Sequence, residues 1–121
     1  MFWVVVDEGV LRRPVGGAWV FGAQLAHLAA VARHPGVMLQ IMPFSAGAHA
    51  GLLGEFTLLG LADGRDIGYT ESVESARLIE KPDEVAAFTL AFDMIRAVAL
   101  SPEASLEFLA RAQGEINGGF D

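Results

Sequence analysis

The sequence contains no cysteine among its 121 residues. Disulfide bonds and thiolate metal ligands are therefore excluded, and a reducing, cytoplasmic setting is expected. The first residues read MFWVVVDE and lack the basic n-region of a signal peptide. No uncharged apolar run reaches the roughly 18–20 residues that a membrane span needs, so no membrane association is expected.

Basic residues are also scarce. The chain has 8 Lys and Arg against 15 Asp and Glu, which gives a formal net charge of −7. Proteins that bind nucleic acids contact phosphates through a basic patch, and this composition does not supply one. We therefore expect no DNA binding by this chain alone.

Apolar residues are abundant, at 53% of the sequence. This share is high for one small domain, and the excess can cover a partner, a second copy of the chain or an apolar pocket. We expect a homodimer whose contact involves a strand edge or the apolar stripes of two C-terminal helices. The residues of those stripes are Phe88, Phe92 and Ile95, and then Leu106 and Leu109.

The pattern along the chain predicts an α+β fold with a single domain over 1–121. Strands are expected at 4–6 and 37–44, at 54–62 and 66–72 as an antiparallel hairpin across DGR, and at 76–81. A helix is expected over 18–33, ended by His34-Pro35-Gly36. Together they predict a small mixed or antiparallel sheet with one N-terminal and two C-terminal helices.

Both C-terminal helices have clear sequence signals. One starts at Pro82, with apolar residues at steps of three and four. The second is predicted to have Ser101 as its N-cap and Pro102 as its first residue, and to end at Gly118-Gly119.

The three histidines do not predict a metal site. His27 and His34 share a helix face, but seven residues at 1.5 Å each place them about 10 Å apart along the axis. Zinc needs ligand nitrogens within about 2.1 Å, so this pair cannot share one ion. No metal and no cofactor are expected.

The stretch IMPFSAGAHAGLLGEFTLL contains a glycine-rich loop around His49. The spacing G-x-x-x-G-x-x-G is not the dinucleotide-binding fingerprint, and a strand follows it instead of a helix. His49 has three open interpretations: a general acid or base, a contact to a ligand or partner, or an ordinary loop histidine. If it is functional, the loop forms the rim of a pocket.

Four further residues are candidates for that pocket. Arg12 follows Asp7-Glu8 and is expected either in a structural ion pair or as a recognition group for a carboxylate or phosphate. Tyr69 and Glu71 share one strand face; they are candidate catalytic and ligand-binding residues, together with His49, if that face is inward. Glu55, at the start of a strand, is a further candidate ligand contact.

Four stretches together resemble a known family: VVDEGVLRRPVGG, QLAHLAAVARHPGVMLQIMPFSAGAHAGLLGEFTLL, YTES and ALSPEASLEFL. They resemble the C-terminal domain of unknown function of actinobacterial XRE-type helix-turn-helix regulators, which are described as antitoxin-like. The resemblance implies a sensing module, a small protein partner and a fold related to ADP-ribosyltransferases. The arginine, Ser-Thr-Ser and Glu-x-Glu set of such transferases is not present, and transferase activity is not expected.

Members of that family have a DNA-binding domain before this segment, whereas this chain enters its first strand directly after Met1. We expect a small-molecule-binding or partner-binding regulatory domain that does not bind DNA. The alternative is a standalone biosynthetic enzyme without a cofactor, a cyclase or isomerase, which needs shape, exclusion of water and one or two polar groups.

Overall fold

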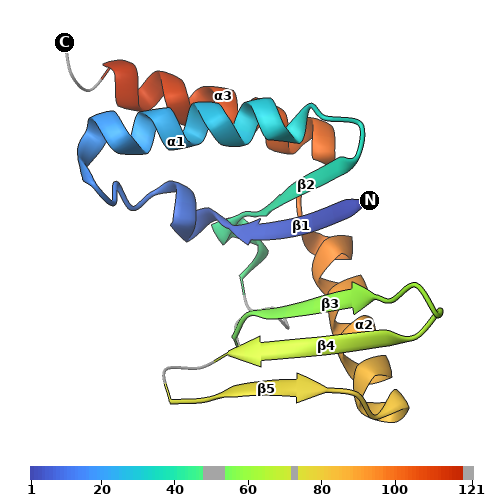
Figure 1. Ribbon diagram of the computed structural model, residues 1–121. Helices are drawn as coiled ribbons and strands as arrows, with labels where there is room; N and C mark the ends of the chain where they lie inside the picture. Colours follow the sequence, from blue (N-terminus) through green and yellow to red (C-terminus); the bar gives the residue numbers. More distant parts are fainter. Residues whose placement is uncertain (48–53, 72–73, 119–121) are drawn as a thin grey trace. The chain divides into compact units, whose positions relative to one another are not determined.

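A computed structural model describes residues 1–47, 54–71 and 74–118 of the chain. By its internal contacts the chain divides into two compact units (Figure 1). Unit 1 comprises Met1–Gly47 and Val98–Asp121, and unit 2 comprises Ala48–Ala97. The α+β class, with one N-terminal and two C-terminal helices, is confirmed.

Unit 1 is built on a β-α-β crossover. Strand β1 (Phe2–Asp7) leads through the 3-10 turn η1 (Glu8–Leu11) to helix α1 (Gly17–Ala32) and strand β2 (Val37–Met42). The two strands are parallel, with Phe2 opposite Val37 and Asp7 opposite Met42. A second 3-10 turn, η2 (Phe44–Ala46), follows.

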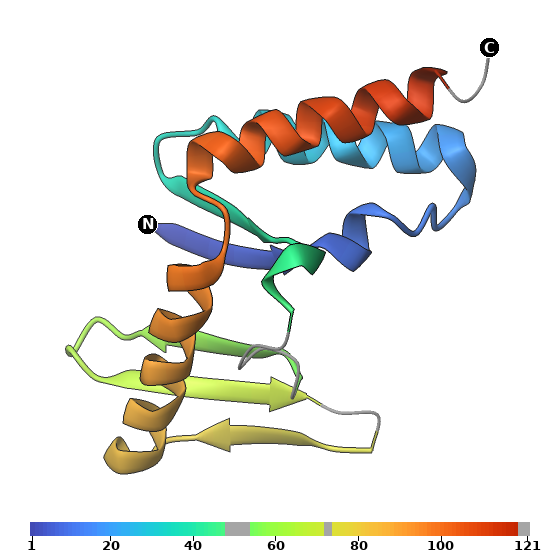
Figure 2. The same cartoon turned by 180° about the vertical axis from the view of Figure 1, so that it is seen from behind.

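Helix α3 (Pro102–Gly118) completes unit 1 and lies beside α1 (Figures 1 and 2). As predicted, the hydroxyl of Ser101 accepts a hydrogen bond from the N–H of Ala104 at 3.1 Å, which caps the helix. The core of unit 1 combines residues from η1, both helices and β2: Leu11, Phe21, Leu25, Ala29, Leu39, Ile41, Leu109 and Ala112.

The second edge of β2 is not open. The N–H of Leu100 donates to the carbonyl of Ile41 at 2.9 Å, and the N–H of Ile41 donates to the hydroxyl of Ser105 at 2.9 Å. Gln40 also takes part, because its side-chain amide donates to the carbonyl of Leu100 at 3.0 Å. The segment before and inside α3 therefore occupies the place that a further strand would take.

Unit 2 is a three-stranded antiparallel sheet with a helix. Strands β3 (Phe56–Gly60), β4 (Asp66–Glu71) and β5 (Ala76–Ile79) follow in the order β3-β4-β5, and α2 (Pro82–Val98) crosses one face (Figures 1 and 2). The rings of Phe56 and Phe88 meet edge to face, with centroids 5.2 Å apart, and join sheet and helix.

The predicted hairpin and the fifth strand are confirmed, but the strands form two sheets where the sequence pattern predicted one. The hydrogen bonds of Leu100 and Ser105 to β2 provide the physical reason on the side of unit 1. The prediction of one domain over 1–121 stays a prediction.

Candidate functional site

The η1 turn sets the position of Arg12. The carboxylate of Asp7 accepts from the N–H of Gly9 at 2.8 Å and so caps the turn. Glu8 opens the turn and Arg12 follows its end, four positions later. Nε of Arg12 donates to Oε2 of Glu8 at 3.1 Å. The structural ion pair expected between an acid and a base of this segment is confirmed for Glu8 and Arg12.

Glu8 is held at both oxygens. Oε1 accepts from the N–H of Phe44 at 2.8 Å, while Oε2 accepts from Arg12. The side chain of Glu8 is only 12% exposed. This carboxylate therefore orients the guanidinium of Arg12 as a fixed anchor, because neither of its oxygens can turn without loss of a hydrogen bond.

Helix α3 supplies the second partner of Arg12. Nη1 donates to Oε2 of Glu115 at 2.6 Å, and the guanidinium carbon lies 5.2 Å from the ring centroid of Phe108. The hydrogen bonds to Glu8 and then to Glu115 raise the pKa of Arg12 above its ordinary value. Within the described part of the chain these two bonds use two of the five guanidinium N–H groups, which leaves three for another acceptor. Sequence reasoning missed both Glu115 and Phe108.

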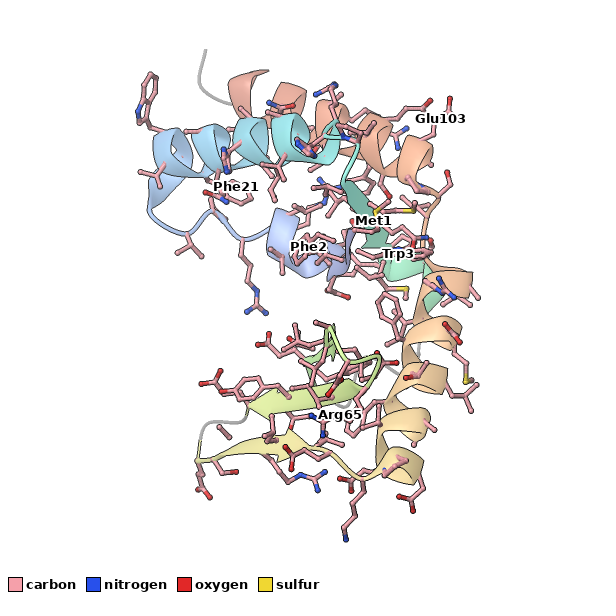
Figure 3. All side chains as sticks on the ribbon, turned by 45° about the vertical axis from the view of Figure 1, so that its right-hand side comes forward. Met1, Phe2, Trp3, Phe21, Arg65 and Glu103 are labelled. Carbon is pink, nitrogen blue, oxygen red and sulfur yellow. The ribbon has the colours of Figure 1, made fainter. Side chains whose placement is uncertain are left out.

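A pocket of about 460 Å³ lies beside this ion-pair group. Its walls come from η1 and the turn after it, from the first turns of α1 and from the end of α3. Phe21 projects from α1 on the side that faces η1 (Figure 3). The lining residues are Leu11, Arg12, Pro14, Gly17, Ala18, Phe21, Ala112, Glu115 and Ile116. We call this cavity the unit-1 pocket.

The turn that opens α1 explains the shape of the pocket. Gly16 and Gly17 have φ values of 81° and 85°, a left-handed conformation that favours glycine. This turn allows the chain to reverse from η1 into α1 within a few residues. The pocket therefore has apolar walls and two charged groups, Arg12 and Glu115, at one side.

The family described as a domain of unknown function, DUF5753, matches residues 1–111. The chain belongs to this family. The match covers nearly all of the chain and includes residues of both units. No curated protein and no solved structure matches the chain, so the relation to ADP-ribosyltransferases stays a prediction.

The other sequence candidates of this DUF5753 chain lie on unit 2 or outside the description. Tyr69 and Glu71 share one face of β4, as predicted, and both are exposed, whereas Gly68 is buried on the opposite face. Among the described residues, neither lines the unit-1 pocket, and the exposed Glu55 does not line it either. His49 and its loop at 48–53 lie outside the described residues.

The remaining histidines lie on or beside α1. His27 is exposed, and His34, just after the helix, accepts a hydrogen bond from the N–H of Gly36 at Nδ1 (3.0 Å). In the described part of the chain, no group of three or more His, Asp or Glu side chains is arranged to hold a metal ion.

Within the described residues, no single helix is both long and apolar enough to cross a membrane. Taken together, Pro82–Val98 and Pro102–Ile116 have the length and composition of a membrane span, although the pair is bent at the break between them.

Proposed function

We propose that the chain is the ligand-sensing domain of a regulator and that the unit-1 pocket binds a small molecule. The ligand places an apolar body between α1 and α3 and directs a neutral acceptor, such as a carbonyl or ether oxygen, at Arg12. The resemblance of the sequence to the C-terminal domain of XRE-type regulators supports a regulatory role.

The observation that carries this proposal is the unit-1 pocket itself. Small-molecule sites in proteins have volumes of roughly 300–1,000 Å³, apolar walls and a few polar groups that fix orientation. The unit-1 pocket has a volume of about 460 Å³, and Leu11, Phe21 and Ile116 are among its walls. Arg12 is the donor that such a ligand needs.

The charge balance favours a neutral acceptor. Glu8 and Glu115 already place two carboxylates against one guanidinium. An anionic ligand would add a third negative charge, whereas a neutral oxygen can accept from the remaining N–H groups without repulsion. Glu8 contributes by position, because it holds Arg12 in one orientation before the ligand arrives.

Binding of the neutral dye Nile red, which has an apolar body and a carbonyl, tests the proposal. Ala18 lines the unit-1 pocket on α1, and Ala23 is exposed on the same helix. Ala18→Phe fills the pocket and should reduce the dye's fluorescence gain at least tenfold. Ala23→Phe is the matched control and should leave it unchanged. Equal binding by both variants and the original chain would show that the dye, and with it the proposed ligand class, does not use this pocket.

Arg12→Lys tests the role of the acceptor. Lysine keeps the charge but loses the planar fork of donors, so the affinity for Nile red should fall several-fold. An apolar fluorescent probe without a carbonyl should bind to Arg12→Lys as it binds to the original chain. The same loss for both dyes would indicate a change of packing and would argue against a hydrogen bond from Arg12.

A regulatory domain of this kind also has partners. We propose a homodimer and no DNA binding by this chain alone, in line with a net charge of −7. The stripe predicted for the dimer needs correction, because Ile95 and Leu109 are buried within the chain. On α2 the exposed apolar side chains include Met94 and Val98, which are 57% and 53% exposed. Light scattering at tens of micromolar chain measures the mass in solution and tests the dimer. The mass of a monomer would contradict the proposal.

A further inference from the structure

Unit 2 has a second cleft, formed between the start of β4, the end of β5 and one face of α2. Its volume is about 560 Å³. Arg65, labelled in Figure 3, contributes to its wall. The lining residues are Arg65, Asp66, Ile67, Glu80, Pro82, Val85, Ala86, Thr89, Leu90 and Asp93. We call this cavity the unit-2 cleft, and all of its residues belong to unit 2.

The apolar part of the cleft comes from α2. Both Val85 and Leu90 line the cleft; Val85 is buried, while Leu90 is 61% exposed and offers an uncovered apolar side chain. Ala86 lies one turn before Leu90 on the same helix, and its small side chain leaves space beside Leu90. An apolar chain that enters the cleft would remove this surface from water, which is favourable in proportion to its area.

The charges around the cleft are unequal. Arg65 is matched by Asp63, with Nε 2.8 Å from Oδ2, and Asp93 is matched by Arg96 at 2.7 Å. In the described part of the chain, no Lys or Arg forms an ion pair with Asp66 or Glu80. Among the described residues of unit 2, the two carboxylates of Asp66 and Glu80 therefore carry negative charge without an ion-pair partner.

Thr89 adds a neutral hydrogen-bond acceptor to the two carboxylates of the cleft. The hydroxyl of Thr89 donates to the carbonyl of Val85 at 3.0 Å. Its single proton is thereby used, and the lone pairs of its oxygen remain for a donor. A ligand that contacts Thr89, Asp66 and Glu80 together needs N–H donors and positive charge. An anionic ligand would be repelled by the carboxylates of Asp66 and Glu80.

We propose that the unit-2 cleft binds a small organic cation: an ammonium or guanidinium group on an apolar body. The cation lies against Asp66 and Glu80, and the body lies against Val85, Ala86 and Leu90. A volume of about 560 Å³ is in the range of small-molecule sites, roughly 300–1,000 Å³. This site is separate from the unit-1 pocket and does not depend on the function proposed for it.

The test uses three probes with the same six-carbon body: n-hexylamine, 1-hexanol and hexanoate. Titration of the full chain is followed by amide chemical shifts in two-dimensional NMR. Hexylamine should shift the amides of Ala86, Thr89 and Leu90 in a saturable way. Hexanol should bind at least fivefold more weakly, and hexanoate should not bind. Equal binding of hexylamine and hexanol would overturn the proposal, because charge would then play no part.

Variants separate the two parts of the site. The double change Asp66→Asn and Glu80→Gln should lower the affinity for hexylamine about tenfold and leave hexanol unchanged, since two exposed carboxylates each add a several-fold electrostatic gain. Leu90→Ala should weaken both probes alike. Glu74→Gln is the matched control, because Glu74 is an exposed carboxylate of unit 2 away from the cleft.

Three further outcomes would contradict the proposal. Unchanged hexylamine binding by the double variant would show that these carboxylates do not hold the cation. An equal loss of hexylamine affinity in Glu74→Gln would show that the affinity depends on the net charge of the chain and not on the two carboxylates of the cleft. If a lysine-rich decapeptide bound more than tenfold tighter than hexylamine and shifted amides well beyond the cleft, the occupant would be a protein segment and not a small cation.

Discussion

Nη1 of Arg12 lies 2.6 Å from Oε2 of Glu115, although the two residues are 103 positions apart in the sequence. This contact joins the η1 turn to the end of α3 across one side of the unit-1 pocket. Because Glu8 holds the same guanidinium from the other side, the position of Arg12 depends on both ends of the chain. The proposed sensing role rests on this arrangement.

The two carboxylates should contribute unequally to stability. The side chain of Glu115 is 61% exposed, so Glu115→Ala should lower the free energy of unfolding by at most about 1 kcal/mol. Glu8→Ala also removes the acceptor of the Phe44 N–H and should cost about 1–2 kcal/mol. Urea unfolding measures both. Glu107→Ala, an exposed position on α3, is the control and should be neutral; a loss there as large as at Glu8 would contradict this ranking.

Ser105 should contribute more to the free energy of unfolding than the size of its side chain indicates. Its side chain is fully buried, and its hydroxyl accepts from the N–H of Ile41 at the edge of β2. Ser105→Ala leaves that N–H without its acceptor and should cost about 1–3 kcal/mol of unfolding free energy. Ser45→Ala, on an exposed position of η2, should change it by less than about 0.5 kcal/mol. Hydrogen exchange of the Ile41 amide should accelerate in Ser105→Ala, and unchanged protection would refute the role of this bond.

Two glycines should respond to alanine in opposite directions. Gly64 in the β3–β4 turn has a φ of 88°, so Gly64→Ala should destabilise the chain by about 1 kcal/mol. Gly114 lies within α3, where an added Cβ meets nothing within 4 Å. Gly114→Ala should therefore stabilise the chain by about 0.5–1 kcal/mol. Thermal unfolding of both variants is the measurement, and shifts of the same sign would be inconsistent with these conformations.

The same turn predicts a pH effect. The carboxylate of Asp63 accepts from the backbone N–H of Arg65 at 3.0 Å and from its Nε at 2.8 Å, and these bonds lower the pKa of Asp63 from its ordinary value. Because the folded pKa lies below the unfolded value, this contribution to stability is complete above about pH 4. It is lost as the pH falls through the folded pKa. A carbon-detected NMR titration of Asp63 should find a midpoint below that of aspartate in an unfolded peptide.

Arg65→Gln separates the two causes of that shift. The backbone N–H, which is the larger cause, remains in the variant, whereas the guanidinium is removed. The pKa of Asp63 should rise but stay below its ordinary value. A return to the ordinary value would show that the side chain alone produced the shift.

Local patterns predicted the elements of this fold well. The helix predicted over 18–33 agrees with α1 (Gly17–Ala32) to within one residue at each end, and the residues DGR identified the β3–β4 turn. The N-cap at Ser101 followed from a serine before a proline. These signals succeed because each depends on neighbours within about one turn of helix or one hairpin.

Contacts between distant segments could not be predicted in the same way. Nothing near Leu100 or Ser105 in the sequence indicates that they bond to β2, so the division into two sheets was missed. Glu115 looks like any exposed acid on a helix until the fold brings it to Arg12. The face of Tyr69 was also undetermined by alternation, which shows that two residues share a face but not which face is exposed. For His49 the catalytic, binding and loop interpretations all stay predictions, as does the cyclase or isomerase alternative.

The most direct test of the sensing proposal is the location of a bound neutral probe. Nuclear Overhauser contacts between Nile red and the unlabelled or selectively methyl-labelled chain report which side chains touch the dye. We predict contacts to the methyl groups of Ile116 and Leu11 and to the ring of Phe21, all lost in Ala18→Phe and retained in Ala23→Phe. Contacts confined to exposed side chains outside the pocket, such as Trp19 or Leu78, would contradict it.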